Sequence, residues 1–178
     1  MKSETLKKYV AAFVLAGVLP AFSGGAMAGG SHSGGHGHAK KHGHAKKIDY
    51  SDVEEHEFGK ASDPKHAAKT VNVDMTDGLR FEPANVTVKK GETVKFIVHN
   101  KGKLQHEMVL GTDHSLMKHS KMMQKFPGME HDEPHMAHVD PGKSHVMGWK
   151  FTQAGTYHFG CLVPGHFEGG MKGTITVQ

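Results

Sequence analysis

The chain has 178 residues, with 22 lysines and arginines against 18 aspartates and glutamates, and its formal net charge is +4. The sequence shows no stripe of basic residues interleaved with aromatic ones, so a nucleic-acid-binding protein is not expected. The single cysteine excludes a disulfide within the chain, which leaves burial or metal binding as the roles for its thiol.

The first 28 residues are typical of a secretory signal peptide. Three lysines precede an apolar run over 10–22, and Ala26-Met27-Ala28 supplies the small residues of a cleavage site. The apolar run is too short to favour the alternative, a retained membrane anchor. Because residues 1–28 carry three lysines and one glutamate, their removal leaves 150 residues with a net charge of +2. We expect a periplasmic protein that has no membrane association after cleavage.

Residues 29–69 are expected to form a disordered His-rich tail followed by a linker. A hexapeptide, His-Gly-His-Ala-Lys-Lys, occurs twice in tandem over 36–47, and residues 29–47 contain no apolar side chain larger than alanine. Without such side chains no core offsets the entropy cost of ordering. Neighbouring imidazoles chelate divalent metals, copper above all, so one hypothesis is accessory copper capture and the alternative is a solubilising tail. The tail histidines are His32, His36, His38, His42 and His44.

Residues 70–178 are predicted to form one all-β domain, a β-sandwich. Over 92–99 the apolar residues Val94, Phe96 and Val98 stand at every second position and therefore share one face of a strand. Turn signals such as Asp77-Gly78 and Lys90-Gly91 separate the predicted strands. Short alternating strands with regular turns favour a sandwich. The predicted strands cover 71–75, 85–88, 92–99, 106–110, 144–151, 156–159 and 172–177.

His106 is a candidate metal ligand because it lies where a loop enters the strand predicted over 106–110. The alternative is a surface histidine at a strand end, which is common in a chain with 17 histidines. Asn100 is expected to fasten the His106 loop to the loop around Cys161 and thereby to orient the ligands. An ordinary turn residue is the alternative for Asn100.

Residues 111–143 form a connection that is longer than two sandwich strands need. A short helix is predicted to run from Asp113, as its cap, to about Lys125, and Pro127-Gly128 ends it. One hypothesis is an auxiliary copper-collecting lobe, because thioethers favour Cu(I) and imidazoles also accept Cu(II). The alternative is a helix that packs on the sandwich while the histidines stay solvated. The histidines are His114, His119, His131, His135 and His138, the methionines are Met117, Met122, Met123, Met129 and Met136, and the expected packing residues are Leu116, Met123 and Phe126.

The stretch from Cys161 to Met171 offers a thiolate, an imidazole and a thioether, with four residues between successive ligands. Copper takes two imidazoles and one thiolate in a trigonal plane, with a weakly held thioether on the axis. Pro164-Gly165 and Gly169-Gly170 permit a tight connection between the flanking strands. Zinc is disfavoured because it rarely binds a thioether. A buried cysteine and a core methionine without metal remain the alternative.

The pattern Phe96-Ile-Val-His-Asn100, His106-Glu and Cys161-x4-His166-x4-Met171 resembles the cupredoxins, the family of plastocyanin and azurin. The resemblance covers the whole predicted sandwich and implies a Greek-key topology with one type 1 copper site. It implies His106, Cys161 and His166 as equatorial ligands and Met171 as the axial ligand. The His-rich tail, the insertion and the signal peptide make the chain most similar to the periplasmic CopI-type copper-tolerance proteins.

Two functions use such a site. A copper-tolerance protein binds copper and lowers its toxicity by sequestering or oxidising it, whereas an electron carrier shuttles electrons between redox partners. The His-rich tail and the insertion favour copper tolerance, because an electron shuttle needs neither. An enzyme is not expected, because one domain lacks the paired histidine motifs of a multicopper oxidase, and Met171 would be idle in a hydrolase with Cys161 as nucleophile. The expected partners are copper ions and a periplasmic redox or copper-trafficking protein.

Overall fold

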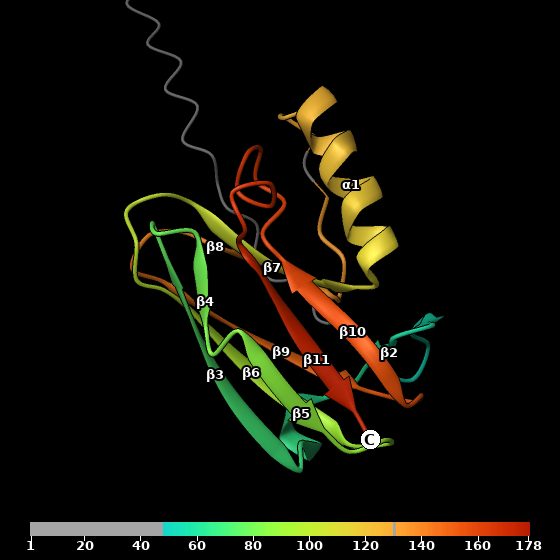
Figure 1. Ribbon diagram of the computed structural model, residues 1–178. Helices are drawn as coiled ribbons and strands as arrows, with labels where there is room; N and C mark the ends of the chain where they lie inside the picture. Colours follow the sequence, from blue (N-terminus) through green and yellow to red (C-terminus); the bar gives the residue numbers. More distant parts are fainter. Residues whose placement is uncertain (1–47, 130) are drawn as a thin grey trace, which may run out of the picture. The chain divides into compact units, whose positions relative to one another are not determined.

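The computed structural model describes residues 48–129 and 131–178, and the signal peptide and tail predicted over 1–47 lie outside this part of the chain. In the described part, two β-sheets pack face to face and a helix stands at one end of them (Figure 1). The elements are β1 (Glu55–His56), β2 (Gly59–Ala61), η1 (Pro64–His66), β3 (Lys69–Thr76), β4 (Arg80–Glu82), β5 (Asn85–Val88), β6 (Thr93–Asn100), β7 (His106–Gly111), α1 (Asp113–Lys125), β8 (Met136–Val139), β9 (Ser144–Lys150), β10 (Gly155–Gly160) and β11 (Lys172–Val177).

The two sheets differ in size, and the chain crosses between them repeatedly. The six-stranded sheet has the order β1-β2-β9-β6-β3-β4, and the five-stranded sheet has the order β5-β11-β10-β7-β8. Strands β3 and β6 pair in parallel, as do β5 and β11, and the other neighbouring strands are antiparallel. The predicted all-β sandwich is confirmed.

The core lies between the sheets and is built by alternation along the strands. Every second residue of β6 is buried, and Val94, Phe96 and Val98 are 0% exposed. Phe159 on β10 and Ile175 on β11 contribute fully buried side chains from the other sheet. Complete burial of one such side chain stabilises the fold by about 1.5–3 kcal/mol. The core therefore holds β7 and β10, whose ends carry the candidate ligands, in a rigid frame.

The segment before β3 belongs to the folded unit. Strand β2 pairs with β1 on one side and with β9 on the other, and Phe58 and Ala61 are buried. The indole Nε1 of Trp149 donates a hydrogen bond to the carbonyl of Phe58 at 2.8 Å. The structure corrects the expectation of a linker up to residue 69 and of a fold that begins at residue 70. Phe58, an apolar residue of this charged stretch, finds its ring partners far along the sequence, in Trp149 on β9 and His135 before β8.

Helix α1 covers the predicted span, but its cap differs from the expectation. The side chain of Thr112 accepts the backbone N–H of Ser115 at 3.1 Å, and Ser115 Oγ accepts the N–H of Thr112 at 2.9 Å. This reciprocal capping box makes Thr112 the N-cap, and Asp113 is the first helical residue instead. Within the described residues, no helix has the length and apolar character that crossing a membrane requires.

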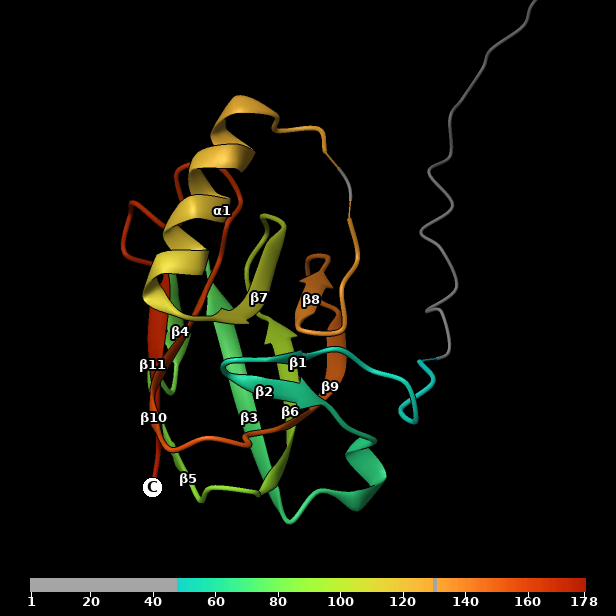
Figure 2. The same ribbon diagram turned by 90° about the vertical axis from the view of Figure 1, so that its right-hand side faces the viewer.

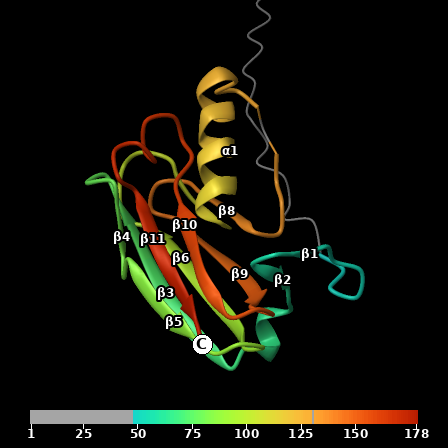
Figure 3. The same ribbon diagram turned by 45° about the vertical axis from the view of Figure 1, so that its right-hand side comes forward.

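Helix α1 packs beside the loop that joins β10 to β11 (Figures 2 and 3). The alternative that the helix packs on the sandwich is correct for Leu116, which is 2% exposed, and for the partly buried Met123. It is wrong for Phe126, which is 56% exposed. The helix thereby covers one flank of the loop that begins at Cys161. The buried cluster comprises Val109, Leu116, Met136, Leu162 and Phe167.

Candidate metal centre

The loop between β10 and β11 is folded tightly by its own backbone. The N–H of Cys161 donates to the carbonyl of Met171 at 3.1 Å, and the N–H of Met171 donates to the carbonyl of His166 at 3.0 Å. Gly165 and Gly170 have φ angles of 87° and 92°, which residues with a Cβ rarely adopt. The predicted glycine turns are present, and the main chain ties the three candidate ligands of this loop together.

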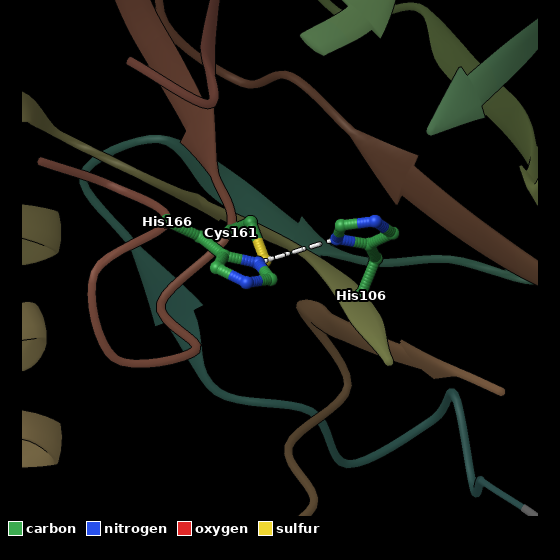
Figure 4. Close-up of side chains that lie close together, drawn as sticks. All are labelled: His106, Cys161 and His166. Carbon is green, nitrogen blue, oxygen red and sulfur yellow. Dashed lines mark hydrogen bonds between the residues drawn. The ribbon is translucent and has the colours of Figure 1, made fainter. Parts of the chain in front are cut away.

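Three of the predicted ligand side chains converge at this end of the sandwich (Figure 4). Cys161 Sγ lies 3.3 Å from His166 Nδ1 and 4.0 Å from His106 Nδ1, and the two Nδ1 atoms are 3.2 Å apart. A point equidistant from the three atoms lies about 2.1 Å from each, which matches metal bonds to nitrogen of about 2.0–2.1 Å and is slightly shorter than metal bonds to sulfur of about 2.3 Å. The size of this triangle fits one metal ion.

The chemistry of the three donors fits copper. Burial raises the pKa of the Cys161 thiol to about 12, so that without a neighbouring cation it stays protonated at neutral pH. A metal cation in the triangle supplies the positive charge that deprotonates a buried thiol. Burial, followed by the nearby charge of His106, lowers the pKa of His166, which keeps this imidazole neutral and able to bind. One thiolate with two neutral imidazoles is a ligand set that copper prefers.

His106 is fully buried, and a carboxylate orients its ring from behind. His106 Nε2 lies 3.1 Å from Oδ1 of Asp77, in the turn between β3 and β4. A carboxylate only accepts hydrogen bonds, so the proton sits on Nε2 and Nδ1 presents its lone pair to the other two donors. The backbone N–H groups of Lys103 and Leu104 also donate to Asp77 and lower the pKa of its carboxyl group. The sequence identified Asp77 only as a turn residue, so this orienting role was missed.

Replacing Asp77 with alanine is expected to weaken copper binding by about 10- to 100-fold, as is usual when the hydrogen-bond partner of a ligand is lost. The physical reason is that His106 loses the acceptor that fixes its tautomer and the direction of Nδ1. Competition against a chelator of known copper affinity measures the change. Asp77→Asn, which keeps an acceptor oxygen, is expected to lose less, and Glu82→Ala, an exposed acid on β4, should have no effect. Equal affinities for Asp77→Ala and Glu82→Ala would contradict the orienting role.

Met171 is buried beside these donors, and its role as the axial ligand stays a prediction. Its side chain is 0% exposed and belongs to the same buried cluster as Cys161. Its main-chain bonds to Cys161 and His166 keep it next to both. Burial at this position is compatible with both interpretations of Met171, a core side chain without metal and the axial ligand. An axial thioether is held weakly and is itself buried in the core.

Asn100 is a buried anchor, but it fastens a different pair of segments from the expected one. Its Nδ2 donates to the carbonyls of Leu104 and Val139, both at 2.8 Å, and its Oδ1 accepts the N–H of Gly102 at 2.9 Å. These bonds hold the loop before β7 against β8. The expected fastening of the His106 loop to the Cys161 loop by Asn100 is therefore corrected.

Glu107 makes that connection instead, a role that was not predicted from the sequence. Its carboxylate is almost fully buried, and Oε1 accepts the N–H of Leu162 at 2.8 Å, directly after Cys161. Its Oε2 lies 2.8 Å from Nδ1 of His138, and this contact raises the pKa of His138. Partners of this kind are what a buried carboxylate requires. The available signal was an acidic residue inside an otherwise apolar strand, directly after the candidate ligand His106.

Comparisons with known proteins agree with this geometry. The family model described as copper binding proteins, plastocyanin/azurin family, matches residues 67–178. The copper-resistant cuproprotein CopI of Rubrivivax gelatinosus is 45% identical over 121 residues, which cover 68% of this chain and 73% of that protein. The copper-resistant cuproprotein CopI of Pseudomonas aeruginosa is 35% identical over 150 residues, which cover 68% of this chain and 82% of that protein.

Solved structures agree on the fold. Auracyanin B superposes with a TM-score of 0.56 at 24% identity, covering 67% of this chain and 96% of that one. The dithionite-reduced auracyanin of Roseiflexus castenholzii superposes with a TM-score of 0.55 at 24% identity, covering 63% and 98%. At this level of identity the likeness bears on the fold alone, and the chemistry of the site depends on its own residues.

Proposed function

The chain belongs to the plastocyanin/azurin family of copper-binding proteins, and from this premise we propose that it confers copper tolerance by binding copper in the periplasm. The ligands in this proposal are His106, Cys161 and His166, with Met171 on the axis. The observation that carries it is the triangle of one thiol and two imidazoles, whose size fits a single copper ion. Two relatives named copper-resistant cuproproteins support tolerance as the purpose of that binding.

The residues around the triangle suit an ion that changes its oxidation state. A bound copper ion supplies one-electron chemistry between Cu(I) and Cu(II). The buried Cys161 keeps the thiolate away from bulk water, and Asp77 holds His106 in one orientation. His166 is only partly buried and is the donor closest to solvent. Rigidly held donors, of which His166 faces solvent, suit both the sequestration and the oxidation of copper.

The proposal extends to the segments that precede the fold. Residues 1–28 act as the export signal, and the histidines of residues 29–47 gather copper before it reaches the main centre. A periplasmic location follows from this signal, and it suits a protein whose ligand is a toxic extracytoplasmic ion.

Electron transfer is the second candidate function, and one observation favours it. The partly exposed ring of His166 lies between the buried thiol and solvent, where a redox partner can approach. The partner would be a periplasmic redox protein. Copper tolerance is preferred because the insertion and the tail have no role in a simple shuttle.

Growth of a deletion strain separates the two functions. Loss of the gene is expected to make cells sensitive to copper while respiration stays normal, and the intact gene should restore growth. A gene encoding Cys161→Ser should fail to restore it, since the central thiolate is absent. Normal growth in copper together with a respiratory defect would instead establish the electron carrier.

A further inference from the structure

A second group of histidines lies between α1 and the segment that leads into β8. His119 Nε2 and His131 Nε2 are 2.7 Å apart, and their ring centroids are separated by 4.6 Å. In the described part of the chain, Nδ1 of His131 and Nδ1 of His135 are buried and have no hydrogen-bond partner. The facing pair therefore includes one imidazole, that of His131, whose second nitrogen is buried and unsatisfied.

The facing pair has the spacing of two adjacent ligands on one metal ion. Copper(II) prefers a square arrangement, in which two bonds of about 2.0 Å at a right angle place their nitrogens about 2.8 Å apart. Burial, followed by the charge of His131, lowers the pKa of His119 and so keeps its ring neutral at pH 7. A neutral imidazole has one lone pair available, which is the form that binds a metal.

Both rings are held by elements that are themselves anchored. His119 lies on α1. The next residue, Ser120, is buried and donates a hydrogen bond to Glu168 in the loop between β10 and β11. The backbone carbonyl of His131 accepts a hydrogen bond from His138 Nε2 at 3.0 Å. The ligand pair is thus prearranged rather than brought together from flexible chain.

The same hydrogen bonds lead to the main copper centre. His138, which holds His131 through Nε2, meets Glu107 through Nδ1 at 2.8 Å. Glu107 in turn accepts the N–H of Leu162, the residue after Cys161. The second group is therefore attached to the strand of one main ligand and to the loop of another.

We propose that His119 and His131 form a second copper site, in which their Nε2 atoms bind Cu(II) side by side. His135 is not part of this pair, because its ring contacts His56, Phe58 and Trp149. The site holds an additional copper ion next to the main centre. A role for the second copper ion in copper storage rests on the copper-tolerance function proposed above. The binding of this ion to His119 and His131 does not rest on that function.

The test counts copper in the full chain after the five tail histidines have been replaced by glutamine. This chain, dialysed against excess Cu(II), is expected to bind two copper ions, and His119→Gln/His131→Gln is expected to bind one. The matched control is His114→Gln, an exposed histidine on the same helix, which should still bind two. Electron paramagnetic resonance should show the second ion as a nitrogen-coordinated signal that disappears when the histidine pair is changed and persists in His114→Gln.

Three results would overturn the second site. They are one copper per chain before the histidine pair is changed, two copper ions in the double variant, or displacement of the second ion by an equal concentration of Zn(II). Circular dichroism checks folding, and His119→Gln alone, at a half-buried helical position, serves if the double variant is unstable. Failure of the proposed function would look different, because the visible absorption would then persist in Cys161→Ser, whereas the second signal does not depend on Cys161.

Discussion

Replacing Cys161 with serine is expected to abolish the intense visible absorption that appears when Cu(II) is added to the protein. That absorption arises from charge transfer between thiolate sulfur and copper, and the sulfur of Cys161 lies 3.3 Å and 4.0 Å from the two imidazole nitrogens. A serine hydroxyl stays protonated and is a hard donor, so it supplies neither the anionic charge nor the softness that the site requires. Visible spectroscopy of the copper-loaded variant measures the loss.

A histidine close in sequence provides the control for this experiment. His158 lies on β10, three residues before the cysteine, and His158→Gln should leave the absorption unchanged because His158 is outside the donor triangle. Metal-free Cys161→Ser should remain folded by circular dichroism, since the exchange alters one atom. Persistence of the absorption in Cys161→Ser would show that the thiolate is not the ligand and would remove the basis of the proposed function.

Replacing Trp149 with alanine is expected to lower the free energy of unfolding of the metal-free protein by about 3–5 kcal/mol. The indole is 1% exposed, and it stacks on Phe58 with ring centroids 5.3 Å apart. Its removal opens a cavity and also leaves the carbonyl of Phe58 without the 2.8 Å hydrogen bond from Nε1. Urea unfolding followed by circular dichroism measures the change.

Trp149→Phe separates the two parts of this loss. It keeps an aromatic ring against Phe58 but removes the hydrogen bond, so a smaller loss of about 1–3 kcal/mol is expected. The copper absorption of both variants should be unchanged when they are folded, because none of the three donors lies on β9. A loss below about 1 kcal/mol for Trp149→Ala would mean that the segment before β3 adds little to the core, against the packing described above.

Local pattern was enough to predict most of the strands, the helix and the ligand loop. Strand β6 alternates in sequence as it does in burial, and α1 covers the predicted residues apart from the identity of its cap. The spacing from Cys161 to Met171 predicted three types of ligand side chain within one short connection. The turn glycines of this connection adopt the positive φ angles that it requires. These features depend on neighbours within a few residues, so the sequence displays them directly.

Other features depend on residues that are distant along the chain. Asp77 contacts His106 across 29 residues, Glu107 reaches Leu162 across 55, and Trp149 reaches Phe58 across 91. No periodicity or motif in the sequence predicts such pairs, because an aspartate in a turn or a glutamate in a strand has the same local sequence pattern with or without its partner. The pairing of His119 with His131 is of the same kind.

The sequence by itself determined the alternating strands, the class of fold and the kinds of donor side chain that are offered to a metal, because periodic burial and donor spacing are local properties. Only the tertiary structure decided which carboxylates orient and connect those ligands, which histidines face each other beside α1, and that residues 48–69 close one edge of a sheet. The physical reason is that these contacts arise where strand ends and loops meet after the sheets have packed. Their geometry is a consequence of the fold, and no short stretch of sequence contains it.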